Sequence, residues 1–220
     1  MQLEKILKSH RFHKVTPYDI NGEPGFVFDM SEGNDTLVNL NLNDQHAFSS
    51  FIFDSIKEAG LSYGIGQYNE DRIIYRRSDL FSDVESRSLH LGIDIWAEAG
   101  TPVYAPEEAI VHSFADNSSH GDYGPTIILQ HETQDVTWYT LYGHLSKESL
   151  SGLGVGLKVE RGQQIATLGT YQENVHWPPH LHFQIMTEMR GYKGDFPGVC
   201  KPSEKDYWLS ICPDPMLVLK

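Results

Sequence analysis

One segment of the chain has the hydrophobic spacing of an α-helix. Apolar residues recur at intervals of three and four between Asp44 and Gly60. Asp is a favoured residue at a helix N-terminus, and Gly commonly follows a helix C-terminus. The pattern therefore predicts a helix over residues 44–60, with an apolar and aromatic stripe that packs into a core.

Most of the other regular segments are short, rich in β-branched and aromatic residues, and bounded by turn-forming Gly, Pro, Asn or Asp. Such segments are typical of β-strands. The strands expected on this basis cover residues 38–43, 72–77, 101–104, 109–114, 126–131, 136–142, 158–169 (a turn and a strand) and 179–185. Many short strands with regular turns predict a mainly β fold, an antiparallel β-sandwich or barrel-like domain.

The order of these patterns predicts three regions. Residues 1–67 combine the helix with a possible edge strand and form an N-terminal α+β extension. Residues 68–190 form the β domain. Residues 191–220 are rich in Gly, Pro and aromatic residues without clear periodicity, and they predict an irregular C-terminal arm.

Composition and charge exclude some classes of partner. The chain has 220 residues, 40% of them hydrophobic and 21% charged, as in ordinary soluble globular proteins. Its net charge of -13 argues against a nucleic-acid partner, because phosphate binding needs a basic surface. The sequence leaves the oligomeric state open.

The N-terminal residues and the cysteines bear on the compartment. Residues 1–10 contain scattered charges and no apolar stretch of the kind found in signal peptides, and no segment approaches the ~20 apolar residues of a membrane span. We therefore expect no membrane association and a cytoplasmic location, or an exported one if a leader is removed. Cys200 and Cys212 are expected to be reduced thiols.

Two histidine-containing clusters suggest metal chemistry. His180 and His182 lie one residue apart in a predicted strand, so their side chains share one face. Far upstream, His90 and Asp94 are expected to share one face of another strand. A lone histidine is more often structural, but the two clusters together provide His90, Asp94 and one of the later pair, which suit a tetrahedral catalytic zinc with its fourth position open to water. The remaining histidine would be free to move protons.

Five motifs carry a resemblance to a known family. They occur in this order: His90-Leu-Gly-Ile-Asp94, Gly100-Thr-Pro-Val-Tyr-Ala-Pro106, Leu141-Tyr-Gly-His144-Leu145, Gly162-Gln163 with Leu168-Gly169, and His180-Leu-His182-Phe183. Over roughly residues 85–187 the chain resembles the lysostaphin-type (LytM-like) zinc metalloendopeptidases. The resemblance implies antiparallel β-sheets, a zinc ion held by His90, Asp94 and His182, and His144 and His180 as the catalytic histidines.

The resemblance also implies an activity. The chain would be a zinc-dependent endopeptidase that hydrolyses amide bonds in peptidoglycan cross-bridge or stem peptides. The alternative is a non-hydrolytic metal-binding or regulatory module of the same fold. Segment 38–43 is expected to be a half-buried edge strand. The lesser alternative is that the N-terminal region lies across the active-site groove, as occluding segments do in some members of this family.

Other polar residues receive weaker expectations. Gln184 replaces an acidic residue common in the family and, on the face of His180 and His182, would orient a ligand. The segment Asn174–Pro179 is bulkier than the small-residue turn usual there. Pro178 and Pro179 exclude the helix that would make His176 a ligand. His112, His131 and His120 are expected to be structural or surface residues, and of these His120 has the better claim to border a substrate cleft, because its loop contains Gly. The arginines of residues 72–77 are expected on a solvated face, and holding a substrate carboxylate is only the lesser alternative for Arg87.

Overall fold

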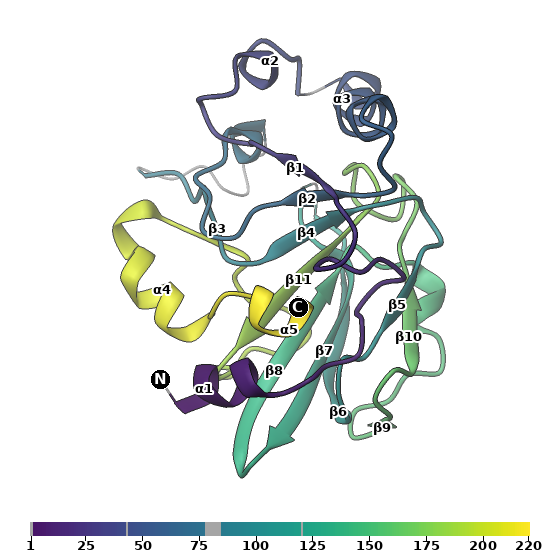
Figure 1. Ribbon diagram of the computed structural model, residues 1–220, viewed down its shortest axis with the longest axis vertical. Helices are drawn as coiled ribbons and strands as arrows, with labels where there is room; N and C mark the ends of the chain where they lie inside the picture. The colour runs from purple at the N-terminus through teal and green to yellow at the C-terminus, as the bar shows by residue number, and fades with distance from the viewer. Residues whose placement is uncertain (1, 43, 78–84, 120) are drawn as a thin grey trace.

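The main sheet has eight strands and contains most of the predicted ones. The computed structural model describes residues 2–42, 44–77, 85–119 and 121–220. The strands run in the order β1-β2-β4-β11-β8-β7-β6-β9 (Figure 1). Their bounds are β1 (Phe26–Phe28), β2 (Gly64–Gly66), β4 (Ile93–Trp96), β11 (His180–Met186), β8 (Val136–Gly143), β7 (Gly124–Thr133), β6 (Ala109–Asn117) and β9 (Lys158–Val159). Only β1 and β2 pair in parallel within this sheet, so the prediction of a mainly β, largely antiparallel fold is confirmed.

Two small sheets accompany the main one. β5 (Pro102–Tyr104) pairs with β10 (Gln164–Thr167), and β3 (Leu89–His90) pairs with β12 (Val199–Cys200). In the second of these, Val199 lies opposite His90. The segment after residue 190 is therefore built into the neighbourhood of the first histidine motif.

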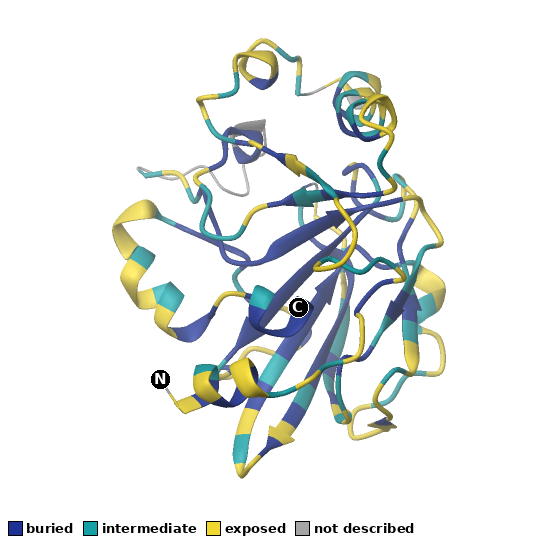
Figure 2. Ribbon diagram, in the orientation of Figure 1, coloured by how far each residue is buried: buried dark blue, intermediate teal, exposed yellow. Residues whose placement is uncertain are grey.

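The centre of the main sheet is buried on both faces (Figure 2). Every residue of β11 is buried, because the strand lies between β4 and β8 and side chains cover it on both sides. Its odd-numbered residues, Leu181, Phe183 and Ile185, belong to the largest hydrophobic core. Since side chains alternate along a strand, the even-numbered residues face the other side, where the polar site lies.

Five α-helices of the described residues surround the sheet. They are α1 (Gln2–Ser9), α2 (Asp35–Val38), α3 (Gln45–Glu58), α4 (Lys205–Ile211) and α5 (Met216–Leu219). α3 confirms the predicted helix: Asp44 Oδ1 accepts hydrogen bonds from the backbone N–H groups of His46 and Ala47, and Gly60 follows with φ +70°. Its buried stripe packs into a second core together with Trp96 and Trp177.

Two predictions outside the central sheet are wrong. The strand expected at residues 38–43 is absent from the described residues 38–42, because the Asn34 side chain caps α2 by accepting from Thr36 N and Leu37 N, and the chain then enters a turn. The expected irregular arm contains α4 and α5. The latter is mostly buried and packs with α1.

Two predictions close to the site also need correction. Residues Ile73–Arg77 form a 3-10 helix instead of a strand, and Arg72 just before it is fully buried instead of lying on a solvated face. His90 and Asp94 do not share one strand, because the chain leaves β3 at His90 and enters β4 at Ile93. They still converge, for reasons given below.

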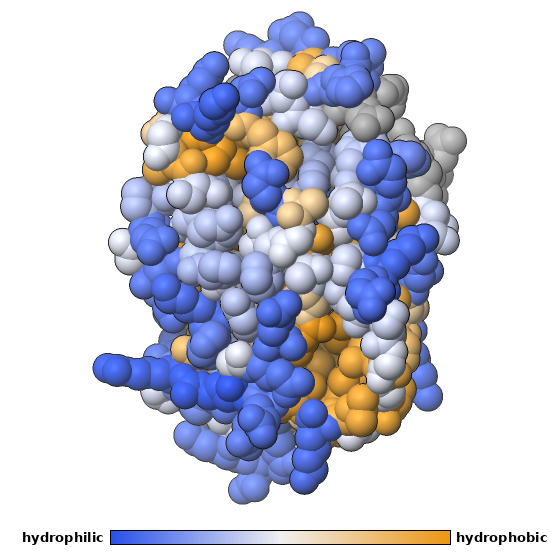
Figure 3. Space-filling model, turned by 90° about the vertical axis from the view of Figure 1, so that its right-hand side faces the viewer, coloured by the Kyte–Doolittle hydropathy of each residue, from blue (hydrophilic) through white to orange (hydrophobic). Residues whose placement is uncertain are grey.

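The outer surface adds two observations. No helix in the described part of the chain is long and apolar enough to cross a membrane. Figure 3, which views the side that carries β5 and β10, shows mostly hydrophilic residues with a hydrophobic area low on this face. Val155 and Leu157, before β9, are among the exposed hydrophobic side chains. The region boundaries after residues 67 and 190 stay predictions.

Candidate metal centre

Strand register brings the site residues together. On β11, His182 lies directly opposite Asp94 of β4 on one side and opposite Gly143 of β8 on the other. His144 follows Gly143, and His180 pairs with Trp96 of β4. Residues from three segments distant in the sequence therefore meet at one point of the sheet.

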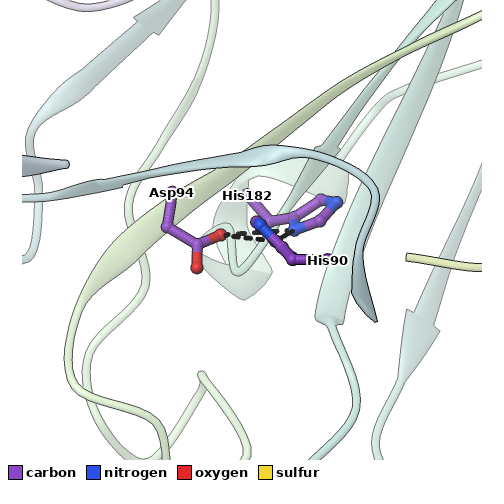
Figure 4. A group of neighbouring side chains, drawn as sticks. All are labelled: His90, Asp94 and His182. Carbon is purple, nitrogen blue, oxygen red and sulfur yellow. Dashed lines mark hydrogen bonds and ion pairs between the residues drawn. The ribbon is translucent and has the colours of Figure 1, made fainter. Parts of the chain in front are cut away.

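Three potential ligand atoms face one another (Figure 4). Asp94 Oδ1 lies 3.3 Å from His90 Nε2 and 3.3 Å from His182 Nδ1, and the two nitrogens are 3.0 Å apart. Four ligands at about 2.0–2.1 Å from a tetrahedral zinc ion would be spaced about 3.3 Å from one another. The donor set and its spacing therefore fit zinc.

Hydrogen bonds on the outer side of each imidazole set its tautomer. His90 Nδ1 lies 3.0 Å from the carbonyl oxygen of Gln67, which can only accept, so this nitrogen carries the proton. Gln184 Nε2 donates to the Pro197 carbonyl oxygen, and this directs Gln184 Oε1 to His182 Nε2 at 2.9 Å. His90 Nε2 and His182 Nδ1 are then both left with lone pairs directed at each other and at Asp94.

The two carboxylate oxygens of Asp94 have different surroundings. Its Oδ2 accepts from Arg72 Nη1 at 2.5 Å, whereas its buried Oδ1 makes no hydrogen bond within the described ranges. Three electron-pair donors thus converge with no proton between them. Such an arrangement is repulsive by itself and is relieved by a cation.

Charge and burial shape the acid-base properties of these groups. Burial, and then the charge of Arg72, lower the pKa of His90 to about 3. Burial alone would raise the pKa of Asp94, but His90 and Arg72 outweigh it and hold that pKa well below its usual range. Asp94 is thus a carboxylate and His90 a neutral imidazole at neutral pH, the forms that bind metal ions.

His180 stands beside the three ligand atoms. Its Nδ1 donates to the carbonyl oxygen of Pro178 at 2.7 Å, so its Nε2 carries a lone pair, and this nitrogen is 4.0 Å from Asp94 Oδ1. Trp96 stacks on its ring with centroids 4.1 Å apart. Burial lowers the pKa of His180 to about 4, so the ring is neutral near pH 7.

His144 completes the group from the end of β8. Its ring centroid lies 4.0 Å from that of His180, and its buried Nδ1 has no hydrogen-bond partner within the described part of the chain. Its backbone has φ +64°, a strained value for a non-glycine residue, held by hydrogen bonds to Tyr123 and Gly169. Burial and the neighbouring His180 lower its pKa well below the usual value.

A cavity opens over these side chains. It has a volume of about 220 Å³ and is lined by Asp94, His144, His180 and His182. Aromatic side chains and three charged residues form much of the remaining wall, namely Tyr75, Trp96, Tyr123, Trp177, Tyr192, Phe196, Arg87, Asp122 and Asp195. The described lining residues begin at Ile74, so the alternative in which the N-terminal region lies across the groove has no residue in this wall.

The other polar residues singled out in the sequence have different surroundings. His131 is buried between Glu108 O and Thr140 Oγ1, and His112 bonds to Ser113, as expected for structural residues. His176 lies in a turn outside the cavity lining, Arg87 and Trp177 line the cavity, and His120 is outside the described residues. Cys200 and Cys212 are free and buried.

Sequence reasoning missed two contributors to the site. Arg72 was interpreted as a surface charge, and Tyr123 was not singled out, although its ring lies 5.0 Å from that of His182. The sequence around Arg72 does not indicate which carboxylate its side chain contacts. Two glycines are possible signals for Tyr123, because a Cβ at Gly143 would lie 2.7 Å from the tyrosine Cδ1 and a Cβ at Gly198 would lie still closer to its Oη.

Comparisons with known proteins find similarity over part of the chain. Residues 88–193 match peptidase family M23. The peptidoglycan DD-endopeptidase ShyC of Vibrio cholerae is 31% identical over 97 residues, 44% of this chain and 20% of that protein. ShyA of the same organism, also a peptidoglycan DD-endopeptidase, is 33% identical over 101 residues, 46% of this chain and 21% of that protein.

A solved structure is also similar to part of the chain. The catalytic domain of lysostaphin from Staphylococcus simulans is 28% identical, with 54% of this chain and 79% of that domain covered and a TM-score of 0.37. The fold is mainly β, and the site has the donor set of a metal centre. The match of residues 88–193 to peptidase family M23 confirms the resemblance to the lysostaphin-type enzymes. The chain matches only about a fifth of the length of the two curated relatives.

Proposed function

We propose that this chain is a zinc-dependent endopeptidase that cleaves amide bonds in peptidoglycan peptides. One observation carries the proposal: three lone-pair donors, His90 Nε2, Asp94 Oδ1 and His182 Nδ1, converge at 3.0–3.3 Å beside a cavity. The same cavity contains two further neutral histidines, His144 and His180. This is the minimum needed for metal-assisted hydrolysis.

In the proposed mechanism His90, Asp94 and His182 hold the metal ion. Zinc bound there supplies Lewis acidity toward the scissile carbonyl and makes water nucleophilic at neutral pH. His180 accepts a proton from the attacking water at Nε2, since its Nδ1–H is committed to Pro178 O. The stacked Trp96 fixes the plane of that ring.

His144 acts on the other side of the reacting bond. Its ring is adjacent to His180 and lines the same cavity. From there its N–H group donates a hydrogen bond to the developing oxyanion, while the leaving amine receives the proton that His180 takes from the water. Its constrained backbone holds the ring at the cavity wall, where the side chain stays buried.

The substrate class follows from the relatives and the shape of the wall. Two relatives carry the name peptidoglycan DD-endopeptidase. The cavity here combines aromatic surfaces with Arg87, Asp122 and Asp195, so it offers contacts to apolar parts and to both charged ends of a peptide. Stem or cross-bridge peptides of peptidoglycan have this mixed character.

The experiment is a cleavage assay on defined peptides. Purified chain loaded with one equivalent of zinc is incubated with cross-linked muropeptides, and products are identified by mass spectrometry. We expect cleavage of an internal amide bond that a chelator abolishes and added zinc restores. Stoichiometric zinc without cleavage of cross-linked or stem peptides would favour the non-hydrolytic module instead.

A further inference from the structure

Arg72 is a fully buried arginine that contacts the proposed metal ligand Asp94. Its Nη1 donates to Asp94 Oδ2 at 2.5 Å, its Nε to Glu70 Oε2 at 2.9 Å and its Nη2 to the Gln67 carbonyl oxygen at 3.0 Å. The side chain is 0% exposed. All three guanidinium nitrogens are therefore tied to fixed acceptors.

The contact with Arg72 gives the two carboxylate oxygens of Asp94 different roles. Oδ2 is occupied by Arg72, while Oδ1 makes no hydrogen bond to any described residue and faces the two imidazoles. We propose that Arg72 is a positioning residue, which orients Asp94 so that a single oxygen, Oδ1, is presented to the metal ion. The inference rests on the proposed metal site and extends it to a residue outside the family-matched segment.

The charges around Arg72 alternate in sign. Glu70 lies on one side of the guanidinium and Asp94 on the other, and Met30 N holds the second oxygen of Glu70 at 2.8 Å. A buried carboxylate without a partner is costly, so Arg72 stabilises Asp94 before any metal ion binds. Glu70 in turn balances the arginine, so its positive charge does not face the metal ion uncompensated.

The backbone around Arg72 serves the same arrangement. Gly66 of β2 lies opposite Asp94, and a Cβ at this position would be 2.7 Å from Arg72 Nη2. The adjacent carbonyl of Gln67 accepts from Arg72 and from His90 Nδ1. One segment, residues 66–72, thus orients two of the three proposed ligands, although it precedes the matched residues 88–193.

The test measures zinc affinity in arginine variants. Arg72→Lys keeps the charge and loses the planar fork, and Arg72→Gln loses the charge. Arg161→Gln is the control, because Arg161 forms a half-exposed ion pair with Glu107 away from the site. Affinity is measured by competition with a chromophoric chelator, and ligand geometry by the visible spectrum of the cobalt-substituted protein.

We expect both Arg72 variants to bind zinc about 10- to 100-fold more weakly than the parent chain and to show an altered cobalt spectrum, with Arg161→Gln unchanged. If the variants fold only with zinc, their relative zinc affinities are obtained from how steeply the unfolding midpoint rises with zinc concentration. If both variants bind zinc with the affinity and cobalt spectrum of the parent chain, or if their unfolding midpoints rise with zinc concentration as the parent's does, the role of Arg72 is overturned but the proposed function is not. A parent chain that binds no zinc would overturn the proposed function as well.

Discussion

His182 and Gln184 lie on the same face of β11, and Gln184 Oε1 accepts the His182 Nε2–H at 2.9 Å. Gln184 is fully buried and donates from its amide nitrogen to Pro197 O, so it cannot turn around without losing both contacts. A residue two positions along the strand thereby selects Nδ1 of His182 as the nitrogen that faces Asp94.

Replacing Gln184 tests this relationship. Gln184→Leu removes the acceptor, so His182 is free to adopt the other tautomer and orientation, and we expect zinc affinity to fall about 10-fold or more. The unpaired His182 N–H and Pro197 carbonyl should also cost about 1–3 kcal/mol of unfolding free energy. Chelator competition and urea unfolding measure the two effects. Unchanged zinc affinity in the folded variant would show that Gln184 does not orient the ligand.

The roles of the two β11 histidines can be separated. His182→Ala and Asp94→Ala should abolish stoichiometric zinc binding, because each removes one of three ligands. His180→Ala should keep the zinc and lose about 10²- to 10⁴-fold in kcat, as expected for a general base. Metal analysis and peptide cleavage are measured on the same preparations, with His112→Ala as the control. Equal zinc loss in all three site variants would mean that the histidine roles are assigned wrongly.

Adding a single methyl group tests the close packing at Gly92, between β3 and β4. A Cβ there would lie 2.6 Å from His182 Cε1 and Nε2 and 2.8 Å from the Phe183 carbonyl oxygen. Gly92→Ala should therefore displace His182, destabilise the fold by about 1–3 kcal/mol and weaken zinc binding. Gly154→Ala is the matched control, since its nearest neighbour would be at 3.6 Å. Equal zinc affinity and stability in the two variants would contradict this packing.

His131 should contribute to acid sensitivity away from the site. Burial lowers its pKa to about 4 in the folded chain, whereas an unfolded histidine titrates near 6.5. The unfolded state thus binds more protons between these values, so the stability due to neutral His131 is full above pH 6.5 and is lost as the pH falls toward 4.

The measurement compares urea unfolding of the parent and of His131→Gln at several pH values. Between pH 6.5 and pH 4 the unfolding free energy of the parent should fall by about 3 kcal/mol more than that of His131→Gln. His46→Gln, at an exposed position, is the control. A parallel pH dependence in the parent and His131→Gln would refute this assignment.

Local patterns in the sequence were sufficient for much of the fold. The helix α3 follows from Asp44, Gly60 and the apolar stripe between them, all of which act within a few turns of chain. The strands β6, β7, β8 and β11 follow from β-branched and aromatic runs. The face shared by His180 and His182 follows from the period of a strand, and the motifs that contain the five predicted site residues follow the order typical of the family.

Predictions failed where residues outside the predicted segment decide its structure. Val38–Asn43 alternates like a strand, but the Asn34 cap and the turn that follows dominate. Residues 72–77 include strand-forming residues, yet Ile73–Arg77 form a 3-10 helix, and Arg72 just before it lies beside Asp94. His90 and Asp94 meet although a strand break separates them, because β12 and β11 hold their two strands.

The sequence by itself determined the residue types of the site and the elements that carry most of them. Only the tertiary structure decided which nitrogen of each histidine faces Asp94, that Arg72 occupies the second carboxylate oxygen, and that Trp96 stacks on His180. The physical reason is range: propensity and periodicity act between neighbours in the chain, whereas tautomers, ion pairs and ring stacking depend on partners up to 92 positions away.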